Sequence, residues 1–431
     1  MLVQFTLKNH KCFKAEIKFS LIASNYDKNT RIKENTLTIE KFNLTLLKSA
    51  VAYGANASGK TKLVEGIKAM KQIILNSSKE GQIDEPIGVT PFLLNTETEA
   101  APTAFEIIFI HENELYRYGF EADKRTIRAE WLYHRPKTKE TELFYRDYQN
   151  FELNKRKFKV NDLIERDRVR PNALLLSVAA NFNEKLAVQV FDWLKQFNIF
   201  SGLEDVEYSA MKMDKGTDRQ GLIDFVKKAD LGIENIGVKS KVKAYRVQDT
   251  VSTTGDVSMV RDVPSMEYWG EDEGYNIGNV KTYHKKYDEN NLPVGQVEFS
   301  MERDEASGVK KYFALAAPVL EVLRKGEILF VDELTDKLHP NLAHQLVGIF
   351  NSKETNPNNA QLIFTTHDTN FLSSGLFRRD QIWFVEKDRY GAASLYSLGD
   401  FKTDKVRKED NFEKNYLNGK YGAVPYLGDF K

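Results

Sequence analysis

The stretch Val51-Ala52-Tyr53-Gly54-Ala55-Asn56-Ala57-Ser58-Gly59-Lys60-Thr61 decides the fold. Its last eight residues match the phosphate-binding pattern G-x-x-x-x-G-K-[ST] at every fixed position. An apolar run leads into the loop, and apolar residues recur at helical spacing after it: Leu63, Ile67, Met70 and Ile74. This order predicts a strand, a phosphate-binding loop and an amphipathic helix, the central unit of an α/β nucleotide-binding domain.

Each fixed position of this pattern has a physical role. Glycines let backbone N–H groups and the helix N-terminus surround phosphate oxygens. Lys60 supplies a cation to the β- and γ-phosphates, and Thr61 offers a hydroxyl to Mg²⁺. The alternative, a glycine turn with an exposed lysine, is disfavoured by the flanking strand and helix. We therefore expect ATP and Mg²⁺ as ligands, with these binding residues: Gly54, Asn56, Ser58, Gly59, Lys60 and Thr61.

A second element lies far downstream, where the apolar run Ile328-Leu329-Phe330-Val331 ends in Asp332-Glu333. Four apolar residues followed by two carboxylates form a Walker B pattern. We expect Asp332 to hold Mg²⁺ and Glu333 to orient and polarise the attacking water. Strands often end in acidic residues, so the assignment depends on its pairing with the phosphate-binding loop.

The next apolar run ends in Phe364-Thr365-Thr366-His367-Asp368. Ligands bind where parallel strands end at their carboxyl edge, so His367 is predicted to contact the γ-phosphate there. A histidine in this position would otherwise be a structural residue. Ile382-Trp383-Phe384-Val385 is a third run of this kind, and the spacing of the three predicts buried parallel strands with helical crossovers.

Composition limits the classes of protein that the chain can belong to. Lys+Arg and Asp+Glu each number 62, so the molecule has no net positive field to attract nucleic acid. No segment approaches a membrane span, and the first residues read as an alternating strand, not as a secretory signal. The single cysteine, Cys12, excludes an intramolecular disulfide and is read as a packing residue. We expect a cytoplasmic protein without membrane contact.

Three segments are predicted along the 431 residues. Residues 1–150 form an N-terminal ATPase lobe, with an opening strand and a hairpin within residues 105–120. Residues 151–295 form a largely helical insertion that includes a helix over residues 186–200 and an irregular segment from about residue 237. Residues 296–431 form a C-terminal lobe with a helix from Ser307 to Arg324 and the strands named above.

The combined motifs resemble the ABC-type ATPase heads of the SMC and RecF groups. The points of similarity are the opening strand with residues 7–13, the asparagine in the phosphate-binding loop, Asp332-Glu333 and the histidine His367. In that group two heads enclose two ATP molecules between them. The resemblance implies that Ser307 and Gly308, shortly before the Walker B strand, contact the γ-phosphate held by a second copy. Ala306 occupies the usual position of the signature serine, which is a departure from the family.

Within this group the chain resembles bacterial phage-defence ATPases of the RloA and AbiL type and the ATPase part of OLD-family proteins. The supporting segments are residues 53–61, 91–94, 331–340, 379–384 and 416–425. This resemblance implies an ATP-hydrolysing sensor that forms at least a dimer and controls a separately encoded effector, a nuclease. A phage protein or a nucleic acid would be the trigger.

Other functions fit the motifs less well. A RecF-like repair ATPase that binds duplex DNA is the main alternative, and neutral net charge counts mildly against it. A kinase would need an acceptor pocket, and a transporter subunit does not suit the long insertion. An OLD-type nuclease would need a further acidic domain, and only residues 368–431 follow the histidine. We expect no intrinsic nuclease activity.

Overall fold

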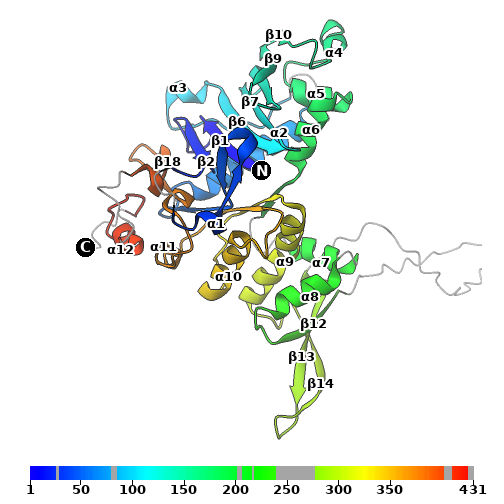
Figure 1. The fold of residues 1–431 in the computed structure, drawn as a ribbon, viewed down its shortest axis with the longest axis vertical. Helices are drawn as coiled ribbons and strands as arrows, with labels where there is room; N and C mark the ends of the chain where they lie inside the picture. The colour runs from blue at the N-terminus through cyan, green and yellow to red at the C-terminus, as the bar shows by residue number, and fades with distance from the viewer. Residues whose placement is uncertain are drawn as a thin grey trace, which may run out of the picture. The chain divides into compact units, whose positions relative to one another are not determined.

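The computed structural model describes residues 1–25, 29–78, 85–200, 206–215, 218–238, 277–401 and 410–425. It divides into two compact units (Figure 1): Met1–Gly202 with Glu321–Lys431, and Leu203–Leu320. This division differs from the three segments expected from the sequence. Residues 151–200 belong to the first unit because Phe158, Leu174 and Trp193 are buried in the same apolar cluster as Phe5 and Ile67.

An antiparallel sheet occupies the N-terminal part of the first unit. Its strands lie in the order β10-β9-β8-β7-β6-β1-β2, with the bounds β1 (Leu2–Lys8), β2 (Ile17–Ser20), β6 (Thr103–His111), β7 (Glu114–Ala122), β8 (Ile127–Arg135), β9 (Thr141–Asp147) and β10 (Asn150–Leu153). The hairpin of β6 and β7 turns at Glu112 and Asn113, which both have positive φ, the conformation that tight hairpin turns require. The predicted opening strand and hairpin are thus confirmed.

A second sheet carries the sequence motifs. Its order is β11-β15-β16-β5-β17-β18, with β5 (Ser49–Tyr53), β11 (Phe197–Phe200), β15 (Ile328–Val331), β16 (Gln361–Thr365), β17 (Ile382–Lys387) and β18 (Ala393–Ser397). All pairs are parallel except β17 with β18. The three apolar runs are therefore buried parallel strands, as predicted. Strand β5 lies between β16 and β17, so both of its neighbours come from the C-terminal part of the chain.

Helix α2 (Lys60–Asn76) follows β5 and joins the cores of the two sheets. Its residues Leu63, Ile67 and Met70 share one buried cluster with Phe5 of β1 and Ala50 of β5. Full burial of a side chain of this size stabilises the fold by about 1.5–3 kcal/mol. The other elements of this unit are β3 (Thr36–Ile39), β4 (Leu44–Leu47), α1 (Ile32–Asn35), α3 (Thr96–Glu99), α4 (Asn161–Glu165), α5 (Leu175–Asn181), α6 (Lys185–Lys195), α10 (Pro340–Asn351), α11 (Asn370–Ser373) and α12 (Phe412–Leu417).

A buried ion pair fixes α5 to the antiparallel sheet. Glu130 of β8 accepts hydrogen bonds from the backbone N–H groups of Leu175 (2.7 Å) and Leu176 (2.9 Å), at the start of α5. Arg146 of β9 lies 3.5 Å from Glu130 and donates to the Ala173 carbonyl at 2.6 Å. Both side chains are fully buried. Burial raises the pKa of Glu130, and the guanidinium opposes this shift.

The second unit combines α7 (Val206–Asp214), α8 (Arg219–Lys227) and α9 (Ser307–Lys325) with the antiparallel strands β12 (Ile233–Val238), β13 (Val280–Tyr287) and β14 (Pro293–Ser300). The predicted helix from residue 307 is confirmed as α9, whose residues from 321 belong to the first unit. Much of the segment expected to be irregular, residues 239–276, lies outside the described residues. The remainder of that segment forms β13 and β14, whose hairpin is shown in Figure 1.

Pro318 lies inside α9 and lacks the N–H that would bond the Ala314 carbonyl. Ser209 of α7 supplies the missing donor, because its hydroxyl donates to that carbonyl at 3.0 Å. The same hydroxyl accepts the N–H of Ala317 at 3.2 Å. One side chain therefore satisfies the backbone groups around the proline. Throughout the described part of the chain, every helix is too short or too polar to cross a membrane.

Candidate functional site

A cavity of about 920 Å³ opens at the carboxyl end of β5 in the first unit. It brings together residues that are far apart in the sequence, from the phosphate-binding loop, the Walker B strand and the end of β16. The lining residues are Lys11, Cys12, Asn56, Ala57, Gly59, Lys60, Thr61, Lys62, Thr90, Pro91, Phe92, Leu93, Leu94, Glu333, His367, Lys387 and Gly391. The predicted candidates Asn56, Gly59, Lys60, Thr61, Glu333 and His367 are among them.

The loop geometry suits a phosphate. At Gly54 a Cβ atom would lie 2.3 Å from the Val385 carbonyl oxygen, and at Gly59, with φ +120°, it would lie 2.7 Å from the Cys12 Sγ. Only glycine fits these two positions without displacement of neighbours. Helix α2 begins directly after Gly59, which is its N-cap, and no described side chain caps it. The first N–H groups of α2 therefore face the loop, as anion binding at a helix N-terminus requires.

Lys60 is folded back onto the loop in this structure. Its Nζ donates to the carbonyls of Gly54 (2.9 Å) and Ala55 (3.1 Å). Burial lowers the pKa of Lys60 from 10.5 to about 8, and the nearby carboxylates of Glu333 and Asp332 oppose the shift. In the loop the buried Lys60 ammonium contacts neutral carbonyl oxygens. A phosphate group would give it an anionic partner and a stronger, charge-assisted hydrogen bond.

Thr365 links the two Walker B carboxylate residues. Asp332 is held at the end of β15 by its backbone N–H, which donates to the Phe200 carbonyl at 3.0 Å, and its Oδ1 accepts a 2.6 Å hydrogen bond from the Thr365 hydroxyl. The same hydroxyl accepts the N–H of Glu333 at 2.8 Å. Glu333 adopts a positive φ of 50°. This turn exposes its side chain to the cavity, whereas Asp332 stays almost buried.

His367 and Glu333 lie side by side at the cavity, with 3.6 Å between Nε2 and Oε1. Burial lowers the pKa of His367, the Lys60 ammonium lowers it further, and the two carboxylates oppose the change. The imidazole is therefore mainly neutral at pH 7. A neutral imidazole can donate one hydrogen bond to a phosphate oxygen without adding a full charge.

Of the two Mg²⁺ ligands predicted from the sequence, Thr61 lines the cavity, whereas Asp332 lies nearly buried at the end of β15 and is not among the lining residues. Magnesium is commonly bound by one or two protein groups together with phosphate oxygens and waters, so two such groups fit the ion. Within the described residues, no group of three or more His, Cys, Asp or Glu side chains could hold a metal by itself.

The rim of the cavity contains residues that the motifs do not identify. Cys12, read from the sequence as a packing residue, also lines this cavity next to Gly59. Leu93 and Leu94 are 56% and 71% exposed, and Leu94 reaches Gly391 on the opposite side. Two adjacent exposed leucines are an apolar surface of the kind that a nucleobase can cover. In the sequence these leucines belong to the apolar run Pro91–Leu94. This run follows neither strand nor helix periodicity, so it did not indicate a place in the fold.

Ser307 and Gly308 are in the second unit, at the first two positions of α9. Ser307 is exposed. These residues are not among those that line the cavity. Ser58, the remaining loop candidate, is buried beneath the loop with its hydroxyl against Gly54.

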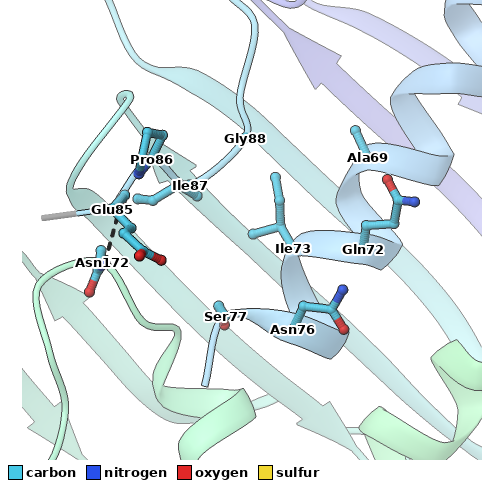
Figure 2. Close-up of a pocket in the computed structure, with 10 residues that line it drawn as sticks. All are labelled: Ala69, Gln72, Ile73, Asn76, Ser77, Glu85, Pro86, Ile87, Gly88 and Asn172. Atoms are coloured by element: carbon cyan, nitrogen blue, oxygen red, sulfur yellow. Dashed lines mark hydrogen bonds between the residues drawn. The ribbon is translucent and has the colours of Figure 1, made fainter. Parts of the chain in front are cut away.

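A second cavity, of about 360 Å³, lies at the C-terminal end of α2 (Figure 2). Gln72, Ile73 and Asn76 line it from the helix, and residues 85–88 line it from the other side. The Asn172 side-chain amide donates to the Glu85 carbonyl at 3.3 Å across one end. Its lining is mostly amide and aliphatic, so it lacks the grouped charges of the first cavity.

The fold and the first cavity define a P-loop ATPase. The family model described as "AAA domain, putative AbiEii toxin, Type IV TA system" matches residues 50–373, and the chain belongs to this family. No curated protein matches the chain. Among solved structures, the SMC head domain from Thermotoga maritima is similar with a TM-score of 0.39 and 12% sequence identity, over 92% of this chain and 98% of that chain.

Proposed function

We propose that the chain hydrolyses ATP to ADP and phosphate and uses this cycle to control a separately encoded effector in an anti-phage defence system. The observation that carries the catalytic part is the pairing of Glu333 and His367 at one cavity with Lys60. The defence part is supported by the toxin–antitoxin description of the family and by the resemblance to phage-defence ATPases.

The catalytic roles follow from the chemistry of each side chain. Lys60 and the N-terminus of α2 bind the β- and γ-phosphates. Thr61 and Asp332 would hold Mg²⁺, which when bound would supply positive charge to the phosphate oxygens. Glu333 accepts a proton from the attacking water as the water oxygen bonds to the γ-phosphorus. The bond to the β-phosphate oxygen breaks, and ADP leaves. His367 donates a hydrogen bond to the γ-phosphate.

To control an effector, ATP binding must change how copies of this chain associate with one another. In the proposal, two copies close on ATP, and Ser307 and Gly308 of one copy contact the γ-phosphate held by the other. At the start of α9, Ser307 is exposed and Gly308 is half-buried, so the serine is available for such a contact. Hydrolysis then reopens the pair and resets or releases the effector, which we propose to be a nuclease.

Glu333→Gln tests the catalytic and assembly parts together. We expect ATP turnover to fall by about 10²- to 10⁴-fold, the usual contribution of a positioned general base. Sedimentation with ATP should show the variant trapped as a dimer or larger assembly, whereas wild type returns to its starting state as ATP is consumed. If Glu333→Gln with ATP sediments as it does without ATP, head closure is wrong.

The effector and its trigger require a separate experiment. Co-purification of the chain with the product of the neighbouring gene, with and without ATP, should give an ATP-dependent complex. Turnover that instead rises only on addition of duplex DNA, with no co-purifying protein, would favour the repair function over defence.

A further inference from the structure

A third cavity in the first unit, of about 410 Å³, lies at the end of β5 that is opposite to the phosphate-binding loop. Its lining comes from the α1 region, the C-terminal end of α10 and Leu376, with these residues: Arg31, Lys33, Glu34, Gly348, Asn351, Ser352, Lys353, Glu354 and Leu376. Strand β5 separates the two sites by on the order of 15 Å, from the rise of its residues. The ATPase mechanism uses none of these side chains.

Asn351 brings a buried donor without a partner to this cavity. Its side chain is 5% exposed, and its Nδ2 makes no hydrogen bond within the described residues. The orientation of the amide is fixed by neighbours, because the Ser49 hydroxyl accepts from Gln381 Nε2 at 2.9 Å and so donates its own proton to Asn351 Oδ1 at 2.8 Å. The Nδ2 group is therefore the end of the amide that remains available for a ligand.

Gln381 is itself fixed in this orientation. Its Oε1 accepts from the Arg378 backbone N–H at 2.9 Å and from Asn35 Nδ2 at 2.7 Å, so its amide nitrogen must face Ser49. The chain of hydrogen bonds leaves no freedom to exchange the oxygen and nitrogen of Asn351.

Lys48, which precedes Ser49 in the chain, is a second buried donor; it is not among the residues that line the cavity, but it interacts electrostatically with two that are, Lys353 and Glu34. It is fully buried, and in the described part of the chain its Nζ has no hydrogen-bond acceptor. Burial lowers the pKa of Lys48, Lys353 lowers it further, and Glu34 opposes the shift; both of these neighbours line the cavity. A buried ammonium without an acceptor is costly unless an anion joins it.

The remaining charges favour an anion at the rim. Arg31, Lys33 and Lys353 outnumber the two carboxylates of Glu34 and Glu354. The Arg31 Nε donates a 2.9 Å hydrogen bond to the Gly375 carbonyl, which holds the guanidinium at the rim of the cavity.

We propose that this cavity binds a small free oxyanion of the inorganic phosphate type, with Asn351 as the buried donor in its wall, Arg31, Lys33 and Lys353 around it, and the buried Lys48 ammonium behind the lining as a further positive charge. A free ion fits better than a nucleic-acid backbone because the two donors without partners are buried, whereas a phosphodiester in a strand stays at the surface. The site does not depend on the proposed ATPase cycle.

The test measures thermal unfolding of the full chain during titration with inorganic phosphate at constant ionic strength. It uses a Lys60→Ala background, so that the P-loop lysine does not contribute to the response. We expect the unfolding midpoint to rise by about 1.5–2 °C at ten times the dissociation constant. Adding Lys48→Met should abolish this rise and leave the midpoint without phosphate equal or higher, since it removes a buried charge that lacks an acceptor.

Two further variants keep the result interpretable. Asn351→Asp retains the oxygen that accepts from Ser49 and replaces the free donor with a carboxylate oxygen, so the response should again be lost even if Lys48→Met does not fold. Lys137→Met, an exposed lysine in the β8–β9 turn, is the matched control and should respond like the parent. An undiminished phosphate response in both Lys48→Met and Asn351→Asp would overturn the site. Duplex DNA that binds with the same Lys48 dependence would overturn the choice of a free ion.

Discussion

Thr365 Oγ1 donates a 2.6 Å hydrogen bond to Asp332, and the same oxygen receives the N–H of the following residue, Glu333, at 2.8 Å. One hydroxyl from β16 therefore positions the carboxylate of Asp332 and the backbone of Glu333 at the end of β15. This dependence makes Thr365 a positioning residue for the proposed Mg²⁺ ion.

Thr365→Val removes the hydroxyl at nearly constant volume. We expect the free energy of unfolding to fall by about 1–3 kcal/mol, because the part-buried N–H of Glu333 and the buried carboxylate oxygen of Asp332 lose their partner. The Mg²⁺ concentration that gives half-maximal ATP turnover should rise by about 10- to 100-fold. Urea unfolding and a magnesium titration of turnover measure the two effects. Thr365→Ser, which keeps the hydroxyl, should stay close to wild type, and a valine variant with wild-type magnesium dependence would contradict the role.

The lowered pKa of Lys60 predicts pH-dependent nucleotide binding. Above its pKa of about 8 the free protein carries a neutral lysine, so ATP binding must take up a proton. The dissociation constant should rise with pH beyond this point, by up to about tenfold per unit. Lys60→Arg, whose guanidinium remains charged, should show no such rise when ATP binding is followed by calorimetry. A flat profile for wild type would show that the lysine keeps its ordinary pKa.

Cys12 provides a chemical probe of the cavity. Its Sγ lies beside Gly59, and burial raises the pKa of the thiol, so alkylation by a maleimide should be slow at pH 7 and accelerate as the thiolate forms at higher pH. ATP should protect the thiol, and the alkylated protein should bind ATP weakly. Mass spectrometry of the intact chain measures the labelling rate directly, since Cys12 is the single cysteine. Equal labelling rates with and without ATP would place the nucleotide away from Gly59.

The buried pair of Glu130 and Arg146 predicts a large stability effect far from the site. Glu130→Ala leaves the guanidinium buried without its carboxylate and removes the cap of α5, so we expect a loss of about 3–5 kcal/mol. The exposed pair of Lys195 and Asp192 is the control, and Asp192→Asn should change stability by at most about 1 kcal/mol. Urea unfolding of both variants gives the comparison. If Glu130→Ala and Asp192→Asn lowered the free energy of unfolding by similar amounts, burial of the ion pair would not explain the size of the loss.

The sequence was sufficient for features that depend on local patterns. The loop at residues 54–61 and the acids after Val331 each follow an apolar strand, and the hairpin around Glu112 alternates polar and apolar residues. Such signals need no knowledge of distant partners, because strand period and turn chemistry are set within a few residues.

Features that depend on distant partners were missed. The sequence indicated a helix over residues 186–200, but α6 ends at Lys195 and Phe197–Phe200 forms β11. A short apolar run of this kind is compatible with a helix or a strand. Residues Phe197–Phe200 form a strand because they pair in parallel with the free edge of β15. The same limit hid the hydroxyl of Thr365 and the thiol of Cys12, whose roles come from residues more than thirty positions away.

The central position of β5 also governs when the site can form during synthesis. Its two hydrogen-bonded neighbours, β16 and β17, are translated long after the loop that follows Tyr53. At ribosomal speed this interval is on the order of tens of seconds. A nascent chain therefore carries its phosphate-binding loop after a strand that lacks both sheet neighbours until residues 361–387 have emerged, and the site can be completed only after that point.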